Sequence, residues 1–242
     1  IEYHNPATAR AYEGYKAVQA FKRRQNTTDD DVIGLLDRSN VSVLDENSNK
    51  DAAIVSTQRD LIAGEVSKDI ARRKLIPTDI LEAHDSGAIH FHDMDYIIQP
   101  MFNCCLINLE DMLTNGTVIN GKKIDTPKSF QVACTVTTQI IAQVASGQYG
   151  GQSINGIDRI LAPFVRKSYE KILNNVIEEQ VEIYGMEPNM EKAREIAWKR
   201  TRKEVKDGIQ TIQYQINTLM TTNGQSPFVT LFMYFKPDYE YA

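Results

Sequence analysis

The chain has 242 residues, of which 42% are hydrophobic and 24% are charged, and its formal net charge is −5 at pH 7. These values are ordinary for a globular protein that buries a sizeable core in one large domain or two small ones. Because the net charge is negative and no broad basic region stands out, we expect no direct binding of DNA or RNA.

Cysteine usage and hydropathy indicate a cytoplasmic protein. Cys104, Cys105 and Cys134 do not make a secreted disulfide framework, and adjacent cysteines bond each other only through a strained ring, so we expect reduced thiols. No apolar run in the sequence approaches membrane-spanning length and no signal peptide opens it, so we expect no membrane association. The sequence starts without methionine and stops soon after an apolar run, and we expect it to be part of a longer protein.

Helices are predicted for the first third of the chain. The elements are a surface helix over residues 5–25, acidic connectors over 25–34 and 44–51, an amphipathic helix over 51–74 and a short helix over 77–87. Asn47 or Ser48 is the predicted cap of the amphipathic helix. Its apolar residues recur at helical spacing and are predicted to form its core face: Ile54, Leu61, Ile62, Val66 and Ile70.

The middle of the chain mixes strand and helix signals. Residues 88–98 alternate loosely and are predicted as a strand, and residues 101–107 form a second extended candidate. The Asn120-Gly121 pair between two short β-branched runs predicts a hairpin with a type I′ turn. Thr126 as cap and Pro127 at the first helical position predict a helix that runs to residue 146.

The last third is predicted to be a helical hairpin followed by a strand. Two long amphipathic segments, residues 153–184 and 190–222, have the periodicity of helices, and the first is interrupted at Pro163 and closed by Gly185. Residues 226–235, SPFVTLFMYF, are short, aromatic and continuously apolar, which is typical of a buried strand.

Residues 91–108, FHDMDYIIQPMFNCCLIN, place reactive groups inside an apolar run. In a regular strand only one of Cys104 and Cys105 faces a given site, and the other belongs to the core. The amide of Asn103 suits a hydroxyl-bearing substrate beside a thiol, provided that the backbone is irregular there, since a regular strand turns Asn103 away from Cys104. From these residues alone, inert buried cysteines are favoured, because free cysteine is commonly buried.

Two histidines precede this run. In an extended strand His90 and His92 point to the same face, a spacing that suits a transition metal. No second pair of ligands is evident in the sequence, so orienting or hydrogen-bonding histidines are favoured and we expect no metal in this chain.

Two further features have both functional and purely structural interpretations. The helix over residues 128–146 is rich in small polar side chains, which suit a close helix seam, a polar ligand or a solvated face: Thr135, Thr137, Thr138, Gln139 and Gln143. The glycine turns at 147–151 and 223–228 end helices. Gly224, Pro227 and Phe228 are also the candidates for a loop that reaches a substrate, although a simple helix-to-strand connection is the favoured explanation from these residues alone.

Four stretches together carry a resemblance to a known family. They are NSNKDAAIVSTQRDLIAGEVSKDIARRKLIP, HDSGAIHFHDMDYIIQPMFNCCLINLEDML, TTQIIAQVASGQYGG and NTLMTTNGQSPFVTLF. In this order, from about residue 45 to about residue 235, they strongly resemble the glycyl-radical, anaerobic ribonucleoside-triphosphate reductases. The resemblance implies an α/β fold of a ten-stranded barrel, built from two parallel half-barrels around a finger loop, in a homodimer.

The resemblance also assigns parts of the chain. Residues 45–242 would be the N-terminal part of the catalytic barrel, an incomplete, helix-rich first half-barrel. Residues 1–44 would be a linker helix after an ATP-binding regulatory domain. The thiyl cysteine, the glycyl-radical loop and a four-cysteine zinc module are expected beyond these residues, so the chain alone is expected to be inactive.

By resemblance, a radical-SAM iron–sulfur enzyme installs the glycyl radical, which generates a thiyl radical that abstracts the ribose 3′ hydrogen. A second cysteine delivers hydrogen as the 2′ hydroxyl leaves as water, and formate supplies the electrons. Cys104 matches this second cysteine, Asn103 its neighbouring amide and His92 a contact for formate or proton transfer. Deoxynucleotide and ATP effectors bind the family at its dimer interface, where Gln139 and Gln143 are the candidates.

Three alternatives remain open from the sequence. Adjacent cysteines also characterise acyltransferases that resemble pyruvate formate-lyase, in which both Cys104 and Cys105 would act. A non-catalytic nucleotide-binding or dimerisation module is a second alternative. A metal hydrolase built on His90, His92 and Asp93 is the third.

Overall fold

The computed structural model describes residues 25–44, 51–185, 187–222 and 224–235. The chain divides into two compact units, residues 1–101 and residues 102–242. Residues 5–24 of the first predicted helix and the predicted caps Asn47 and Ser48 lie outside the described residues. The boundary after residue 44 stays a prediction.

The first unit is helical in the described residues. Its elements are α2 (Thr28–Leu36), α3 (Val41–Leu44), α4 (Val55–Ile70), a π-helical turn η1 (Ala71–Leu75), α5 (Thr78–Asp85) and a 3₁₀ turn η2 (Met94–Tyr96). The helices predicted over 51–74 and 77–87 are confirmed as α4 and α5. The connector predicted over 25–34 is wrong, because three aspartates in the first turn of α2 complement the positive end of the helix dipole.

The buried face of α4 is polar, contrary to the predicted apolar core face. The fully buried residues are Thr57, Glu65, Ser67 and Asp69, whereas the predicted core residues are only half-buried. The Ser67 hydroxyl donates a hydrogen bond of 2.9 Å to the Met94 carbonyl. Asp69 accepts two hydrogen bonds from the Arg73 guanidinium, at 2.8 and 2.6 Å, and one of 2.7 Å from the Thr28 hydroxyl. These partners satisfy the buried polar groups, so α4 packs through hydrogen bonds.

The strand predicted over residues 88–98 is wrong. Asp93 has a φ of 60°, in the left-handed region, and η2 follows it directly. Met94 is buried in a small cluster with Ala71, Ile76 and Leu81. Burial of Met94 and the hydrogen bond from Ser67 hold this segment in a compact turn that a regular strand does not allow.

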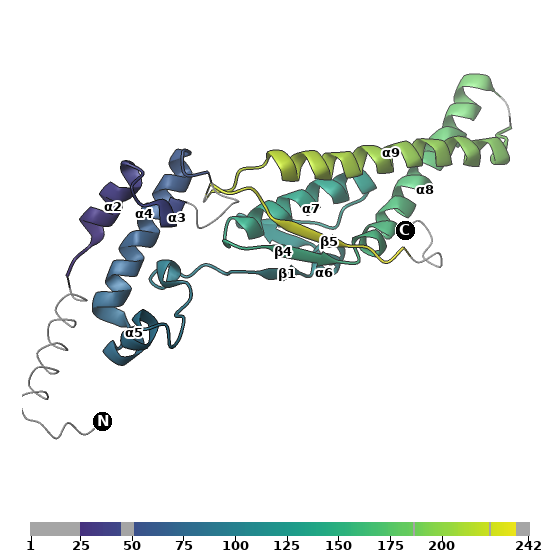
Figure 1. The fold of residues 1–242 in the computed structure, drawn as a ribbon. Coiled ribbons are helices and arrows are strands. Elements are labelled where there is room, and N and C mark those ends of the chain that lie inside the picture. Colours follow the sequence, from purple (N-terminus) through teal and green to yellow (C-terminus); the bar gives the residue numbers. More distant parts are fainter. Residues whose placement is uncertain (1–24, 45–50, 186, 223, 236–242) are drawn as a thin grey trace, which may run out of the picture. The chain divides into compact units, whose positions relative to one another are not determined.

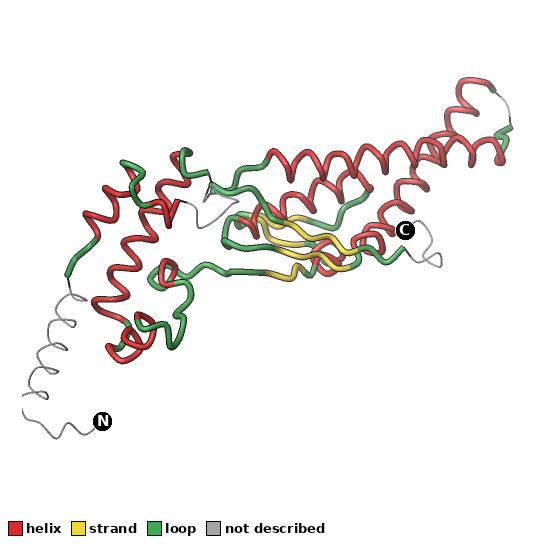
Figure 2. The backbone as a smooth tube through the Cα atoms, viewed as in Figure 1, coloured by secondary structure: helices red, strands yellow, loops and turns green. Residues whose placement is uncertain are grey.

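The second unit is built on a three-stranded parallel sheet. Its strands β1 (Cys105–Ile107), β4 (Gln152–Asn155) and β5 (Val229–Phe232) lie in the order β1-β4-β5, and Figure 2 shows them side by side. A separate hairpin pairs β2 (Thr117–Ile119) with β3 (Lys122–Ile124). The helices are α6 (Leu109–Thr114), α7 (Phe130–Ala145), α8 (Ile157–Tyr184) and α9 (Met190–Thr218).

Several predictions for this unit are confirmed. The hairpin turns at Asn120 and Gly121, with φ values of 49° and 72°, as a type I′ turn requires. Residues 101–107 contain strand β1. Helices α8 and α9 pack against each other as the predicted hairpin, although Pro163 lies inside a continuous α8 and does not interrupt it.

Two boundaries and the burial of one strand differ from prediction. Residues 152–155 are strand β4 and not the start of a helix, because they pair with two strands that are distant in sequence. The cap of α7 is Ser129 and not Thr126, whose hydroxyl donates instead to the Thr114 carbonyl at 2.7 Å. Strand β5 pairs with β4 at the sheet edge, so its residues are half-buried or exposed and not buried as predicted.

Helix α7 lies between the sheet and α9 (Figure 1) and carries much of the core of this unit. A Cβ atom at Gly208 of α9 would lie 2.6 Å from the Phe130 ring, so glycine permits the close approach of these two helices. The Thr137 hydroxyl turns back to the Ala133 carbonyl, and the Thr138 hydroxyl contacts the Gln215 amide oxygen of α9. Some of the polar side chains of α7 therefore lie at the contact between α7 and α9 within the chain.

The first turn of α7 is capped by other helices. The Phe130 amide donates to the Ser168 hydroxyl of α8 at 2.8 Å, and the Gln131 amide donates to the Glu204 carboxylate of α9 at 3.2 Å. Ser168 in turn donates to Glu204 at 2.9 Å. This network satisfies helix amides that have no partner within α7 and ties three helices together.

Candidate functional site

Three segments meet at the amino ends of the three parallel strands. They precede β1, β4 and β5, whose residues Cys105, Gln152 and Val229 stand in register. Four backbone hydrogen bonds join them: Phe102 to Gly147 at 3.4 Å, Tyr149 to Phe102 at 3.1 Å, Cys105 to Gly151 at 3.1 Å and Gln152 to Phe228 at 2.9 Å. The residues just before the strands therefore lie side by side, although they are far apart in sequence.

The two adjacent cysteines face different surroundings. Cys104 is exposed, whereas Cys105 is partly buried against the core of the second unit. Strand β1 begins only at Cys105, so Asn103 and Cys104 lie in the irregular segment before it. There the Cys104 thiol donates a hydrogen bond to Asn103 Oδ1 at 3.3 Å. The predicted pairing of amide and thiol is thus present, in the non-strand geometry that it requires.

Cys134 is the third thiol and lies in a different environment. It is fully buried in α7, and burial together with the nearby Glu204 carboxylate raises its pKa to about 12. A thiol with such a pKa stays protonated at neutral pH and is a poor nucleophile. Cys134 therefore belongs to the core, and Cys104 is the one exposed thiol among the described cysteines.

Two glycines in the turn before β4 allow Asn103 and Phe228 to lie close to this turn. A Cβ atom at Gly150 would lie 2.2 Å from both the carbonyl oxygen and Oδ1 of Asn103. A Cβ atom at Gly151 would lie 2.8 Å from the Phe228 ring. No larger residue fits without displacing these side chains. The sequence interpretation of this turn as helix termination missed the contacts, because only the fold brings residues 103 and 228 to it.

The loop before β5 contains the three predicted substrate-binding residues. Gly224 has a φ of 75° and is buried, and Pro227 is buried as well. Phe228 is 57% exposed beside Gly151. Of the three, only Phe228 offers an accessible side chain, next to the turn before β4, while Gly224 and Pro227 shape the loop.

Gln139 and Gln143 are both exposed on α7. They are four residues apart and so share one face of the helix. That face is available to a ligand or to another chain, as their predicted role in effector binding requires.

His92 belongs to the first unit. The rings of His84 and His90 are 5.6 Å apart, those of His90 and His92 are 5.4 Å apart, and His92 Nδ1 contacts the Asp93 carboxylate. The Phe91 amide donates to His84 Nδ1 at 3.1 Å. Among the residues that the structure describes, no group of three or more His, Cys, Asp or Glu side chains is arranged to hold a metal ion. The hydrolase alternative gains no support from this cluster.

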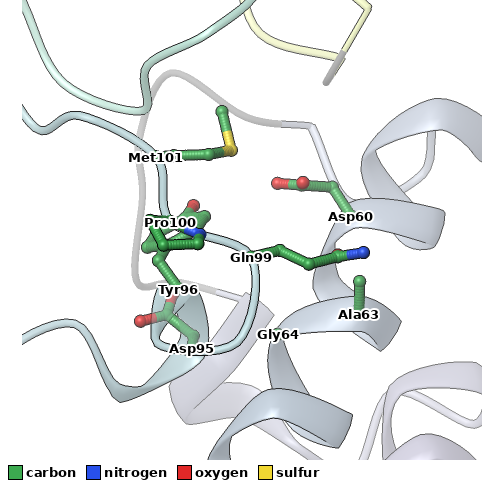
Figure 3. A pocket seen from close by; sticks show the side chains of 8 residues that line it. All are labelled: Asp60, Ala63, Gly64, Asp95, Tyr96, Gln99, Pro100 and Met101. Atoms are coloured by element: carbon green, nitrogen blue, oxygen red, sulfur yellow. The ribbon is translucent and has the colours of Figure 1, made fainter.

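The first unit also contains a pocket of about 280 Å³, shown in Figure 3. Asp60 and Gly64 of α4 line one part of it, and Gln99 and Met101 come from the segment after η2. None of the predicted site residues lines this pocket.

No helix in the described parts of the chain is long and apolar enough to cross a membrane.

Comparison with known proteins identifies relatives along the chain. A family model described as anaerobic ribonucleoside-triphosphate reductase matches residues 46–242. The chain is 44% identical over 227 residues to the protein of that name from Haemophilus influenzae, covering 93% of this chain and 31% of the relative. It is 46% identical over 224 residues to the Escherichia coli protein, covering 92% of this chain and 30% of the relative. The chain thus spans less than a third of the length of these curated relatives.

Solved structures of an anaerobic ribonucleotide reductase share the fold of this chain. The anaerobic ribonucleotide reductase from Thermotoga maritima in complex with dATP and CTP matches 96% of this chain, with a TM-score of 0.55 and 14% identity, over 36% of its own chain. The same reductase with MES in the active site gives a TM-score of 0.56. The likeness confirms the predicted fold class, a helix-rich part of the α/β barrel of these reductases.

Proposed function

Because this chain belongs to the anaerobic ribonucleoside-triphosphate reductase family, we propose that it is part of a catalytic subunit that reduces ribonucleoside triphosphates to deoxyribonucleoside triphosphates. The supporting observation is the exposed Cys104 thiol, hydrogen-bonded to Asn103 at the amino ends of the parallel strands. Since the chain spans less than a third of its relatives, we propose that it is inactive by itself.

In this proposal Cys104 is the hydrogen donor of the reaction. Ribonucleotide, formate and a proton give deoxyribonucleotide, carbon dioxide and water, so formate is oxidised as the 2′ carbon is reduced. Asn103 Oδ1 orients the Cys104 S–H bond, and its amide N–H groups are free to donate to a ribose hydroxyl. Phe228, which lies against Gly151, would supply an apolar wall for the substrate, and Gly224 and Pro227 would fix the loop that carries it.

The remaining parts of the proposal extend beyond the sheet. A glycyl radical, installed by a radical-SAM iron–sulfur enzyme, would supply the radical that starts the reaction, and it would lie with a zinc module in other parts of the parent protein. We assign formate or proton transfer to His92, and deoxynucleotide or ATP effectors to the exposed pair Gln139 and Gln143. Residues 45–242 would belong to the catalytic barrel and residues 1–44 to a linker, in a cytoplasmic homodimer.

The test replaces each of the adjacent cysteines in a full-length reductase that contains this segment. Cys104→Ala removes the hydrogen donor, and we expect no detectable deoxynucleotide formation. Cys105→Ala removes a partly buried thiol that packs on the core, so we expect turnover to remain and thermal stability to fall slightly. Turnover is measured anaerobically with formate and a ribonucleoside triphosphate.

The acyltransferase and the non-catalytic nucleotide-binding module predict different results. Equal loss of turnover in both variants would support an acyltransferase that uses both thiols. Binding of deoxynucleotides without turnover by the unmodified full-length protein would support a nucleotide-binding module. The opposite environments of Cys104 and Cys105 favour the reductase.

A further inference from the structure

A chain of buried amides connects the loop before β5 to the turn before β4. Gln225 is 2% exposed, and its Nε2 donates to the Gln148 carbonyl at 2.8 Å. Gln148 is 1% exposed, and its Nε2 donates to the Gly150 carbonyl at 3.1 Å. Buried hydrogen bonds of this kind have few alternative arrangements, so they fix the backbone on both sides of Tyr149.

Gly150, whose backbone is fixed in this way, contacts Asn103 directly. The Gly150 Cα faces the carbonyl oxygen and Oδ1 of Asn103 so closely that a Cβ atom would lie 2.2 Å from each. Asn103 Oδ1 is also the acceptor for the Cys104 thiol. The position of the Gly150 backbone therefore limits where the amide, and with it the S–H bond, can lie.

Stability alone does not explain the buried glutamines. The Oε1 atom of Gln225 has no hydrogen-bond partner among the described residues, and the same holds for Gln152, whose Nε2 donates to the Ile141 carbonyl. A buried acceptor without a partner costs free energy that an apolar side chain of similar size avoids. Gln225 is kept at this cost while it bonds to the turn that contacts Asn103, which indicates a reason other than packing.

We propose that Gln225, Gln148 and Gly150 are positioning residues that set the orientation of Asn103 and thereby of the Cys104 S–H bond. The proposal rests on the hydrogen-donor role of Cys104 and adds the residues that orient its S–H bond. Each of the three acts through Asn103. Hydrogen transfer needs the donor close to and aligned with the acceptor carbon, and a misplacement of about 1 Å can cost about 100-fold in rate.

The first test is Gly150→Ala with Gly147→Ala as its matched control. Both glycines lie in the same turn, and neither has a positive φ. A Cβ atom at Gly147 meets nothing nearer than the Val144 carbonyl oxygen, at 3.7 Å, which is an ordinary contact. In a full-length reductase we expect kcat of Gly150→Ala to fall by about 100-fold with little change in KM, and kcat of Gly147→Ala to stay at the unsubstituted value.

A second readout does not depend on turnover. In the chain itself, the rate of alkylation of Cys104 by iodoacetamide is followed by peptide mass spectrometry, and we expect it to change in Gly150→Ala but not in Gly147→Ala. Buried Cys134 is an internal folding control, since its thiol becomes reactive only when the helical core opens. If Gly150→Ala exposes Cys134, Gln225→Met decides the question, because it removes the amide donor at similar volume.

For Gln225→Met we expect the same loss of kcat, with Gln213→Met at an exposed position of α9 unchanged. Unaltered kcat and unaltered Cys104 alkylation in both folded variants would overturn the positioning role. A full-length parent that does not reduce ribonucleotides would overturn the proposed function instead. The alkylation rates would still report whether Gly150 and Gln225 determine the orientation of the Cys104 thiol.

Discussion

Helices α4 and α7 are both sixteen residues long, yet they bury opposite kinds of side chain. The fully buried residues of α4 are polar, whereas most of those of α7 are apolar. Helix α4 is held by directed hydrogen bonds to neighbouring elements, and α7 is held by close packing against α9 and the sheet. Amphipathic periodicity therefore identifies a helix without revealing how its buried face is held.

The two modes of packing should fail in different ways. Close packing is sensitive to added volume and insensitive to acid. A buried hydrogen-bonded carboxylate is sensitive to protonation. Substitutions at the α7–α9 contact, at the cap of α7 and at Asp69 separate the two modes.

The largest effect is expected from added volume at the α7–α9 contact. Gly208→Leu places a side chain where even a Cβ atom would lie 2.6 Å from the Phe130 ring and 3.0 Å from Cys134 Sγ. Overpacking of this kind costs about 1–3 kcal/mol, and we expect the upper end of this range because both neighbours are buried. Chemical denaturation followed by fluorescence of Trp198, the single tryptophan of the sequence, measures the change in the second unit.

The control for added volume is Gln213→Leu, at an exposed position of the same helix. We expect its free energy of unfolding to stay within about 0.5 kcal/mol of the unsubstituted chain. Equal stability of Gly208→Leu and Gln213→Leu would contradict close packing as the basis of the α7–α9 contact.

A smaller loss is expected from the cap of α7. Ser168→Ala leaves the buried Phe130 amide without its acceptor, which costs about 1–3 kcal/mol. Ser129→Ala removes an exposed cap from the same turn, where water can replace the hydroxyl, and we expect about 0.5–1 kcal/mol. Denaturation curves of the two variants rank the caps, and a larger loss for Ser129→Ala would show that the interhelical cap contributes little.

Local chemistry explains what the sequence could predict. The hairpin at Asn120-Gly121 depends on two residues that tolerate positive φ. Helices α5, α8 and α9 also followed from periodicity and terminal signals. These features need only neighbours in sequence.

The features that were missed depend on distant partners. Strand β4 has four residues, and only its pairing with β1 and β5 makes it a strand. Asp69 is buried because Thr28 and Arg73 satisfy it. In the site, the contact of Gly150 with Asn103 exists only after the strands assemble. Sequence reasoning therefore pointed to Cys104 and Asn103, which the structure places in hydrogen-bond contact, and missed the contact of Gly150 with Asn103 and the buried glutamines beside it.

The smallest effect, and the one most specific to α4, is expected from acid. Hydrogen bonds from the Arg73 guanidinium, with help from Thr28, hold the pKa of Asp69 below its ordinary value of 3.8, despite burial that acts in the opposite direction. A carboxyl whose pKa is lower in the folded state contributes stability that is fully present above pH 3.8 and is lost as the pH falls through the lowered value. Helix α7 contains no Asp, Glu, Lys or Arg of its own, and the Glu204 carboxylate of α9 accepts a hydrogen bond from its first turn, at Gln131, so the amides of α7 beyond that turn are the ones to compare.

Hydrogen exchange of the α4 and α7 amides, corrected for the intrinsic rate at each pH, measures this difference. Below pH 3.8 we expect protection in α4 to fall before protection in α7, because protonated Asp69 no longer pairs with Arg73. Asp69→Asn should lower protection of α4 at neutral pH and remove most of its acid response. Asp30→Asn, at an exposed carboxyl of α2, should keep that response. If α4 in Asp69→Asn still loses protection in acid as the unsubstituted chain does, another group carries the response, and the contrast between the two helices does not rest on Asp69.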